Sequence, residues 1–211
     1  MPIRLKKLKL CCRGILKKWL LPNKASTSRI NRLRSNVRYE GEHALTMLTD
    51  LFELYRLTLR EQEHCCSLLS LSIRTTTEIN YILHPLLLCF LIVLKVKEPE
   101  TYKSFITEEI SSFELLDYLR NKEGAEKLLD SHYGKVLEAY IVSCKTYTNE
   151  SYKDLERYKA TAEATSISSS AGNVEKERAN KILQILNDFE WSNNVLDYLV
   201  KKLEIVSRFK T

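Results

Sequence analysis

The residue types best suited to chemistry stand together at His64, Cys65 and Cys66, where an imidazole precedes two thiols. Imidazole nitrogen and thiolate sulfur are ligands that zinc prefers in proteins. Adjacent side chains on a helix point about 100° apart, however, so these three cannot converge on one ion without ligands from another element. His84 and Cys89 could supply such ligands if the two segments packed side by side. We expect instead that the cysteines are buried and behave as small hydrophobic side chains, with no metal bound.

Motifs for nucleotide binding and for hydrolysis are missing from the sequence. It contains no G-x-x-x-x-G-K-[ST] phosphate loop, no G-x-S-x-G nucleophile turn, no H-E-x-x-H pair and no C-x-x-C pair. Its five glycines, at positions 14, 41, 124, 134 and 172, are too dispersed to surround a phosphate with backbone N–H groups. His84 lies in an apolar stretch with no identifiable nucleophile or carboxylate partner, so we expect a core or helix-end histidine rather than a catalytic base. The sequence therefore predicts a protein that is not an enzyme and that binds no cofactor.

The elements that position these side chains are predicted to be helices. Only 5 Gly and 4 Pro occur among 211 residues, which leaves few residues for tight turns. Apolar residues at helical spacing predict a first amphipathic helix over roughly residues 41–56. Similar patterns recur along the chain as far as Val206. We expect an all-α fold, an irregular bundle of about six to eight helices that ends in a C-terminal αα-hairpin.

The segment YRLTLREQEHCC, residues 55–66, marks the start of a helix. Thr58 fits the N-cap position and Glu61 fits the N3 position that follows it. In such a capping box, each side chain accepts a hydrogen bond from the backbone N–H of the other residue. The helix should therefore begin at Leu59 and run to about Leu83.

Residues 86–94 contain no polar side chain, which is the longest apolar run in the chain. A helix needs about 20 such residues to span a bilayer, so this run is too short by half. We expect it to be the central, buried helix of the bundle, beginning after Pro85. Pro99 suits the first turn of the next helix, because the ring fixes a helical φ angle where no N–H is needed.

Composition divides the chain into four predicted parts. These are a basic arm and linker over residues 1–40, a helical bundle over 41–160, a Ser/Ala-rich linker over 161–173, and a helical hairpin over 174–211. Two adjacent cysteine pairs and two single cysteines form no recognisable disulfide framework, and no secretory signal is apparent. A reducing, cytoplasmic compartment is therefore expected.

The arm is strongly basic, since residues 1–39 hold 12 of the 33 Lys and Arg and none of the 27 Asp and Glu. Its first part is amphipathic enough to lie on an anionic membrane surface. A basic tail without fixed structure and an organelle-targeting presequence remain alternatives. Nucleic acid is a weaker expectation, because no aromatic side chains alternate with the arginines. The expected contacts with an anionic surface are Lys6, Lys7, Lys9, Arg13, Lys17, Lys18, Arg29, Arg32 and Arg34.

Residues 42–110 resemble the KAP family of P-loop NTPases. In that family a Ser/Thr-Leu-Arg-x-x-Glu motif opens a helix, and an apolar helix and a K-x-x-x-P-x-x-Y turn follow it. The chain departs from the family because the phosphate loop, the magnesium-binding strand and the membrane helices have no counterpart in it. Glu61 also stands earlier than the glutamate of the family motif. The matching residues here are Thr58, Leu59, Arg60 and Glu61, then Lys95, Pro99 and Tyr102.

The resemblance implies a helical module that corresponds to the C-terminal part of a KAP protein without its nucleotide-binding core. Such a module would act through protein interaction, with a nucleotide-binding core in trans as one implied partner. Arg60, at a helix N-terminus, could reach a phosphate or an acidic partner, although a solvated first-turn arginine is the favoured expectation. The alternative hypothesis is a peripheral membrane protein that binds through the basic amphipathic arm.

Overall fold

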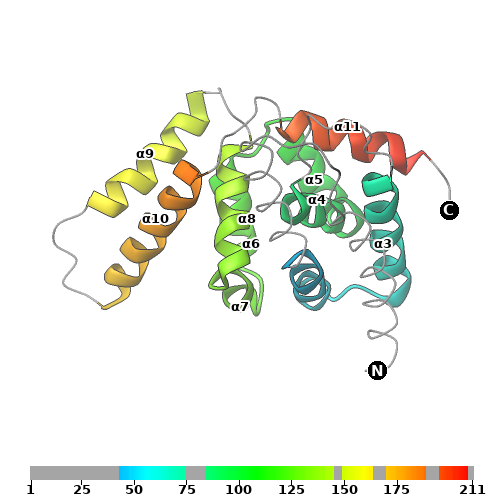
Figure 1. The fold of residues 1–211 in the computed structure, drawn as a ribbon, viewed down its shortest axis with the longest axis horizontal. Coiled ribbons are helices and arrows are strands. Elements are labelled where there is room, and N and C mark those ends of the chain that lie inside the picture. The colour runs from blue at the N-terminus through cyan, green and yellow to red at the C-terminus, as the bar shows by residue number, and fades with distance from the viewer. Residues whose placement is uncertain (1–42, 75–83, 145–148, 164–169, 189–194, 209–211) are drawn as a thin grey trace, which may run out of the picture. The chain divides into compact units, whose positions relative to one another are not determined.

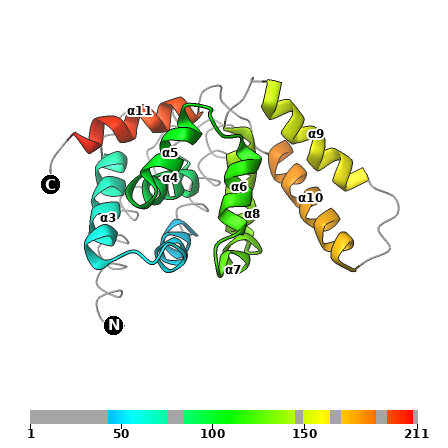
Figure 2. The same cartoon turned by 180° about the vertical axis from the view of Figure 1, so that it is seen from behind.

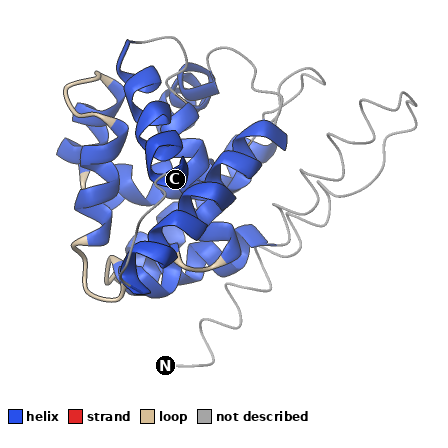
Figure 3. Cartoon of the chain, turned by 90° about the vertical axis from the view of Figure 1, so that its left-hand side faces the viewer, coloured by secondary structure: helices blue, strands red, loops and turns tan. Residues whose placement is uncertain are grey.

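The computed structural model describes residues 43–74, 84–144, 149–163, 170–188 and 195–208. These residues are helical and contain no strand, as Figure 3 shows, so the predicted all-α class is confirmed. Residues 43–54 form the first described helix. The others are α3 (Leu59–Arg74), α4 (Pro85–Lys97), α5 (Pro99–Ile106), α6 (Ser112–Arg120), α7 (Ala125–Leu129), α8 (His132–Ser143), α9 (Asn149–Glu163), α10 (Ser170–Asp188) and α11 (Val195–Ser207) (Figure 1).

The described part holds more helices than the six to eight predicted, because several of its helices are short. Residues 99–129 alone contain α5, α6 and α7, of 8, 9 and 5 residues. The chain divides into two compact units, one of residues up to Tyr102 together with those from Leu199, the other of Lys103–Tyr198. This division differs from the predicted boundaries, which separate the chain at 40, 160 and 173.

The first unit is built around α4. Its residues from Pro85 to Leu94 are all buried, and Pro85 stands in the first turn, where a missing N–H leaves no gap in the hydrogen bonding. Fully burying a side chain such as leucine contributes about 1.5–3 kcal/mol, so this run supplies a large share of the unit's apolar stabilisation. The predicted central buried helix is confirmed. Its neighbour α3 packs against it.

Two glycines shape the turns of the second unit. Gly124 precedes α7 with a φ of 86°, a left-handed conformation that favours glycine. Gly134, in the first turn of α8, lies so close to α7 that a Cβ atom would stand 2.0 Å from the carbonyl oxygen of Leu128. A side chain at position 134 would therefore force α7 and α8 apart. Between α6 and α8, the Ser112 hydroxyl donates to the carbonyl of Ile141 at 2.8 Å.

Helices α9 and α10 lie side by side and run in opposite directions, as both views show (Figures 1 and 2). The predicted Ser/Ala-rich linker is wrong at its two ends, since α9 continues through Glu163 and α10 begins at Ser170. Alanine and glutamate are strong helix formers, so the sequence ATAE at 160–163 extends a helix. Within the second unit α10 packs against α9 and α8, and the predicted hairpin over 174–211 stays a prediction. Residues 164–169 lie outside the described part.

Candidate functional site

The family-like motif begins with the predicted capping box, which the structure confirms. The backbone N–H of Thr58 donates to Glu61 Oε2 at 2.6 Å, and the N–H of Glu61 donates to Thr58 Oγ1 at 3.4 Å. The bond from the Thr58 backbone, followed by one from Lys97, holds the pKa of Glu61 below its ordinary value. Thr58 and Glu61 therefore set where α3 begins.

The other motif residues join α4 to its neighbours. Lys97 at the end of α4 pairs with Glu61 at 3.1 Å, which ties α4 to the start of α3. The motif residue Lys95, two positions before Lys97, pairs with Glu204 of α11. The Lys95 ammonium also stands 5.1 Å from the ring centroid of Tyr102, a favourable contact between a cation and the face of an aromatic ring. These contacts connect helices and leave both lysines engaged with protein side chains.

Pro99 and Tyr102 belong to α5. Pro99 is the first residue of the helix, as predicted. Tyr102 is buried, and burial followed by the nearby charge of Glu204 raises the pKa of its hydroxyl. A phenol held in its neutral form in this way serves packing rather than proton transfer near neutral pH.

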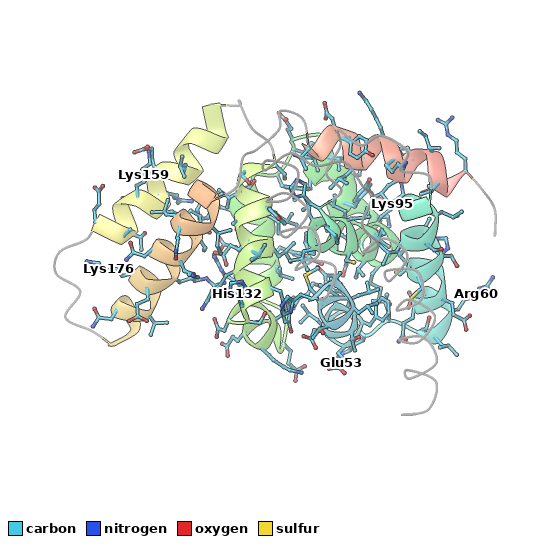
Figure 4. All side chains as sticks on the ribbon, in the orientation of Figure 1. Glu53, Arg60, Lys95, His132, Lys159 and Lys176 are labelled. Carbon is cyan, nitrogen blue, oxygen red and sulfur yellow. The ribbon has the colours of Figure 1, made fainter. Side chains whose placement is uncertain are left out.

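Arg60 is exposed, as are Thr58 and Pro99, and it is the charged residue among these three. It lies in the first turn of α3, beside the half-buried Leu59, and points away from the helix (Figure 4). Its guanidinium is therefore placed to meet a phosphate or a carboxylate on another molecule. The structure thus separates the motif into residues that connect helices and one arginine that faces outward.

The cluster of His64, Cys65 and Cys66 is divided by the helix, as the 100° spacing predicts. His64 is exposed, Cys65 is buried and Cys66 is half-buried. Burial, followed by the charge of Glu61, raises the pKa of the Cys65 thiol to about 12, so the reactive thiolate is suppressed. Cys89 is buried in α4, and the buried Cys65 and Cys89 confirm the expectation of cysteines in the core. In the described ranges, no three His, Cys, Asp or Glu residues are grouped so as to hold a metal ion.

His84 is buried at the N-terminal end of α4, where it occupies the cap position with an extended backbone. Burial lowers its pKa from 6.5 to about 4. The imidazole is therefore neutral at physiological pH. The prediction of a core or helix-end histidine is confirmed.

The most concentrated polar arrangement in the second unit surrounds Glu138 and was not predicted. Glu138 lies in the middle of α8 with none of its surface exposed. Its carboxylate accepts hydrogen bonds from Arg120 Nη2 of α6 at 2.7 Å and from the Tyr158 hydroxyl of α9 at 2.6 Å. It also accepts from Arg178 of α10, through Nε at 3.0 Å and through Nη2. One buried carboxylate therefore joins four helices.

Further contacts surround this carboxylate. Arg178 also donates to Asp130 at 2.9 Å, at the end of α7. The ring of Tyr158 stacks on Phe113 of α6, with 5.4 Å between centroids. Burial, followed by the charge of Glu138, raises the pKa of the Tyr158 hydroxyl, which therefore remains a hydrogen-bond donor. We call Glu138, Arg120, Tyr158, Arg178 and Asp130 the Glu138 cluster.

A signal for this cluster was present in the sequence. Glu138 is the only charged residue in the apolar run VLEAYIV, residues 136–142. A carboxylate at such a position must find cationic partners when it is buried. Those partners come from positions 18 to 40 residues away along the chain, so local spacing could not name them.

The predicted anionic-surface contacts, from Lys6 to Arg34, lie outside the described residues. Among the helices that are described, none combines the length and the apolarity needed to cross a membrane. No protein-family model matches this chain, and no curated protein and no solved structure matches it either. The resemblance to the KAP family accordingly stays a prediction.

Proposed function

We propose that this chain is a non-catalytic helical module that acts in the cytoplasm by binding another protein. The observation that carries the proposal is the use of the family-like motif. The motif residues Thr58, Glu61 and Lys95 form a cap and ion pairs between helices, with Lys97 outside the motif as the partner of Glu61. Arg60 faces outward. Side chains committed to helix contacts in this way favour a scaffold over a reaction centre.

The character of the surface indicates the kind of partner. In the described part, the exposed large apolar side chains are Val174 and Ile205, at 65% and 54% exposure, one in each unit. Two isolated side chains form no apolar patch. An interface formed by the described part of the chain would therefore be mainly polar and charged. In line with the resemblance, the proposed partner is a nucleotide-binding core in trans, with Arg60 contacting a phosphate or an acidic side chain at its edge.

The proposal is tested by photocrosslinking in cells. Benzoylphenylalanine is placed at position 60 in one variant and at position 177, an exposed residue of α10, in a matched control. The expected result is one discrete adduct from position 60, containing a protein with a phosphate-binding loop, and none from position 177. Equal labelling from both positions, or no adduct from position 60, contradicts the proposal.

A second candidate function is peripheral membrane binding, which is favoured by the basic arm with its 12 cations and no acidic residue. Cations on an amphipathic segment are attracted to anionic lipid headgroups. The full chain should then sediment with anionic vesicles, less so when salt rises from about 0.1 M to about 0.5 M, since salt screens such charges. A chain that lacks residues 1–22 should remain in solution. Equal binding to neutral vesicles, or by the shortened chain, contradicts this function.

A further inference from the structure

Where the burial of α9 and α10 is described, few of their side chains are fully buried against the rest of the second unit. Across residues 155–163 of α9, Tyr158 is the buried side chain. Between residues 172 and 186 of α10, the buried residues are Gly172, Ala179, Ile182 and Ile185, of which two have little or no side chain. The remaining positions there are exposed or half-buried, and many of them are charged. Elements with few buried apolar contacts are those that open at the lowest free energy.

Hydrogen bonds and ion pairs attach α9 and α10 where apolar contacts are few. Both α9 and α10 carry donors to the fully buried carboxylate of Glu138. Tyr158 comes from α9 and Arg178 from α10, so the two helices share one acceptor. Arg178 adds a bond to Asp130 and one to the carbonyl of Leu129. When one of the two helices leaves, the other loses part of its attachment.

We propose that α9 and α10 form a strap that opens from α6 and α8 as one unit, with Glu138 as its latch. The strap comprises residues 149–163 and 170–188. In the closed state its two donors hold the carboxylate in the interior, where it is unfavourable without them. In the open state water takes their place around Glu138, while α6, α7 and α8 keep their own contacts. The inference does not depend on the proposed function.

Hydrogen–deuterium exchange of the full chain, followed by mass spectrometry, measures the opening. The strap should exchange as a block, faster than residues 136–142 of α8. In Glu138→Gln, an amide nitrogen replaces one carboxylate oxygen and faces the donors of that oxygen, which are Arg120 and Tyr158 on one side or Arg178 on the other. Exchange throughout the strap should then rise roughly 100-fold, as expected when a buried ion pair is broken. The matched control Glu126→Gln, at an exposed position of α7, should leave it unchanged.

A milder variant keeps the inference testable if Glu138→Gln fails to fold. Tyr158→Phe removes one hydroxyl on α9 and should accelerate exchange about 5- to 10-fold, in α10 as well as in α9. The effect on α10 is decisive, because a hydroxyl that served only its own helix would leave α10 unchanged. Acceleration confined to α9, acceleration of α8 to the same degree as the strap, or no acceleration in either variant overturns the inference.

Discussion

Helix α4 and the strap are both held against neighbouring helices, but by different forces. The packing surface of α4, which we call its seat, is a run of ten buried residues without a charged atom, from Pro85 to Leu94. The seat of the strap is centred on the carboxylate of Glu138 and the two arginines around it. Apolar burial is nondirectional and tolerates small shifts, whereas a buried carboxylate requires each donor in place. The two units of one all-α chain therefore have different weak points.

The largest effect is expected from a cavity in the apolar seat. Phe90→Ala removes one of the largest fully buried side chains of α4 and should lower the free energy of unfolding by about 4 kcal/mol. Urea unfolding followed by circular dichroism measures it. The control Val174→Ala, at a side chain 65% exposed, should change stability by less than about 0.5 kcal/mol. A loss of under about 1 kcal/mol from Phe90→Ala would show that α4 is not a well-packed core helix.

The next effect concerns the polar seat. Arg178→Met leaves Glu138 with fewer partners in the interior and should destabilise the second unit by about 3 kcal/mol. The double variant Glu138→Met with Arg178→Met should lose less than the single one, because apolar side chains of similar volume can replace a buried ion pair. The same urea experiment compares the two. A double variant that is less stable than Arg178→Met contradicts the view of Glu138 as a buried charge that depends on its donors.

A pH experiment tests the buried histidine at the N-terminal end of α4. The pKa of His84 is about 4 in the folded chain, below its ordinary value of 6.5. Between these two values the unfolded chain takes up a proton that the folded chain does not, so stability falls as the pH drops through this window and is unaffected above it. By pH 5 the loss from His84 should be about 2 kcal/mol. His84→Gln should show a shallower fall between pH 7.5 and pH 5, and parallel curves would contradict the assignment.

The smallest effect compares one helix start in each unit. Thr58 caps α3, and Ser111 caps α6 with a matching capping box in which Glu114 stands where Glu61 does. Thr58→Ala and Ser111→Ala should each lower the free energy of unfolding by about 1 kcal/mol. Circular dichroism melting curves measure both losses. A negligible loss for Thr58→Ala would mean that the Lys97–Glu61 pair alone fixes the start of α3.

The features that the sequence predicted well depend on neighbouring residues. The cap at Thr58, the buried run after Pro85 and the helix start at Pro99 each follow from local spacing and backbone chemistry. The capping box at Ser111 has the same S/T-x-x-E spacing and was readable in the same way. The cysteine cluster also behaved as helix geometry requires.

The features that were missed depend on contacts between distant residues. Arg178 reaches Glu138 across 40 positions, and nothing near either residue indicates the other. The packing of α10 on α8 depends on this contact and on the buried Ile182 and Ile185. The apolar stripes in the sequence alone are equally compatible with a pair formed by α10 and α11. The small residues at 160–163 suggest a linker by composition, but alanine and glutamate favour helix, and α9 continues through them. The basic arm lies outside the described residues, so its predicted role stays open to the vesicle experiment.

The proposed non-catalytic function predicts that ATP does not stabilise this chain, and thermal melting of the full chain tests the proposal most directly. Melting curves are recorded with magnesium alone and with magnesium and saturating ATP. A ligand at 100 times its dissociation constant stabilises a protein by about 2.7 kcal/mol, which corresponds to a rise of roughly 5–10 °C for a chain of this size. The account predicts curves that coincide within about 1 °C. A rise of several degrees that requires ATP would contradict it.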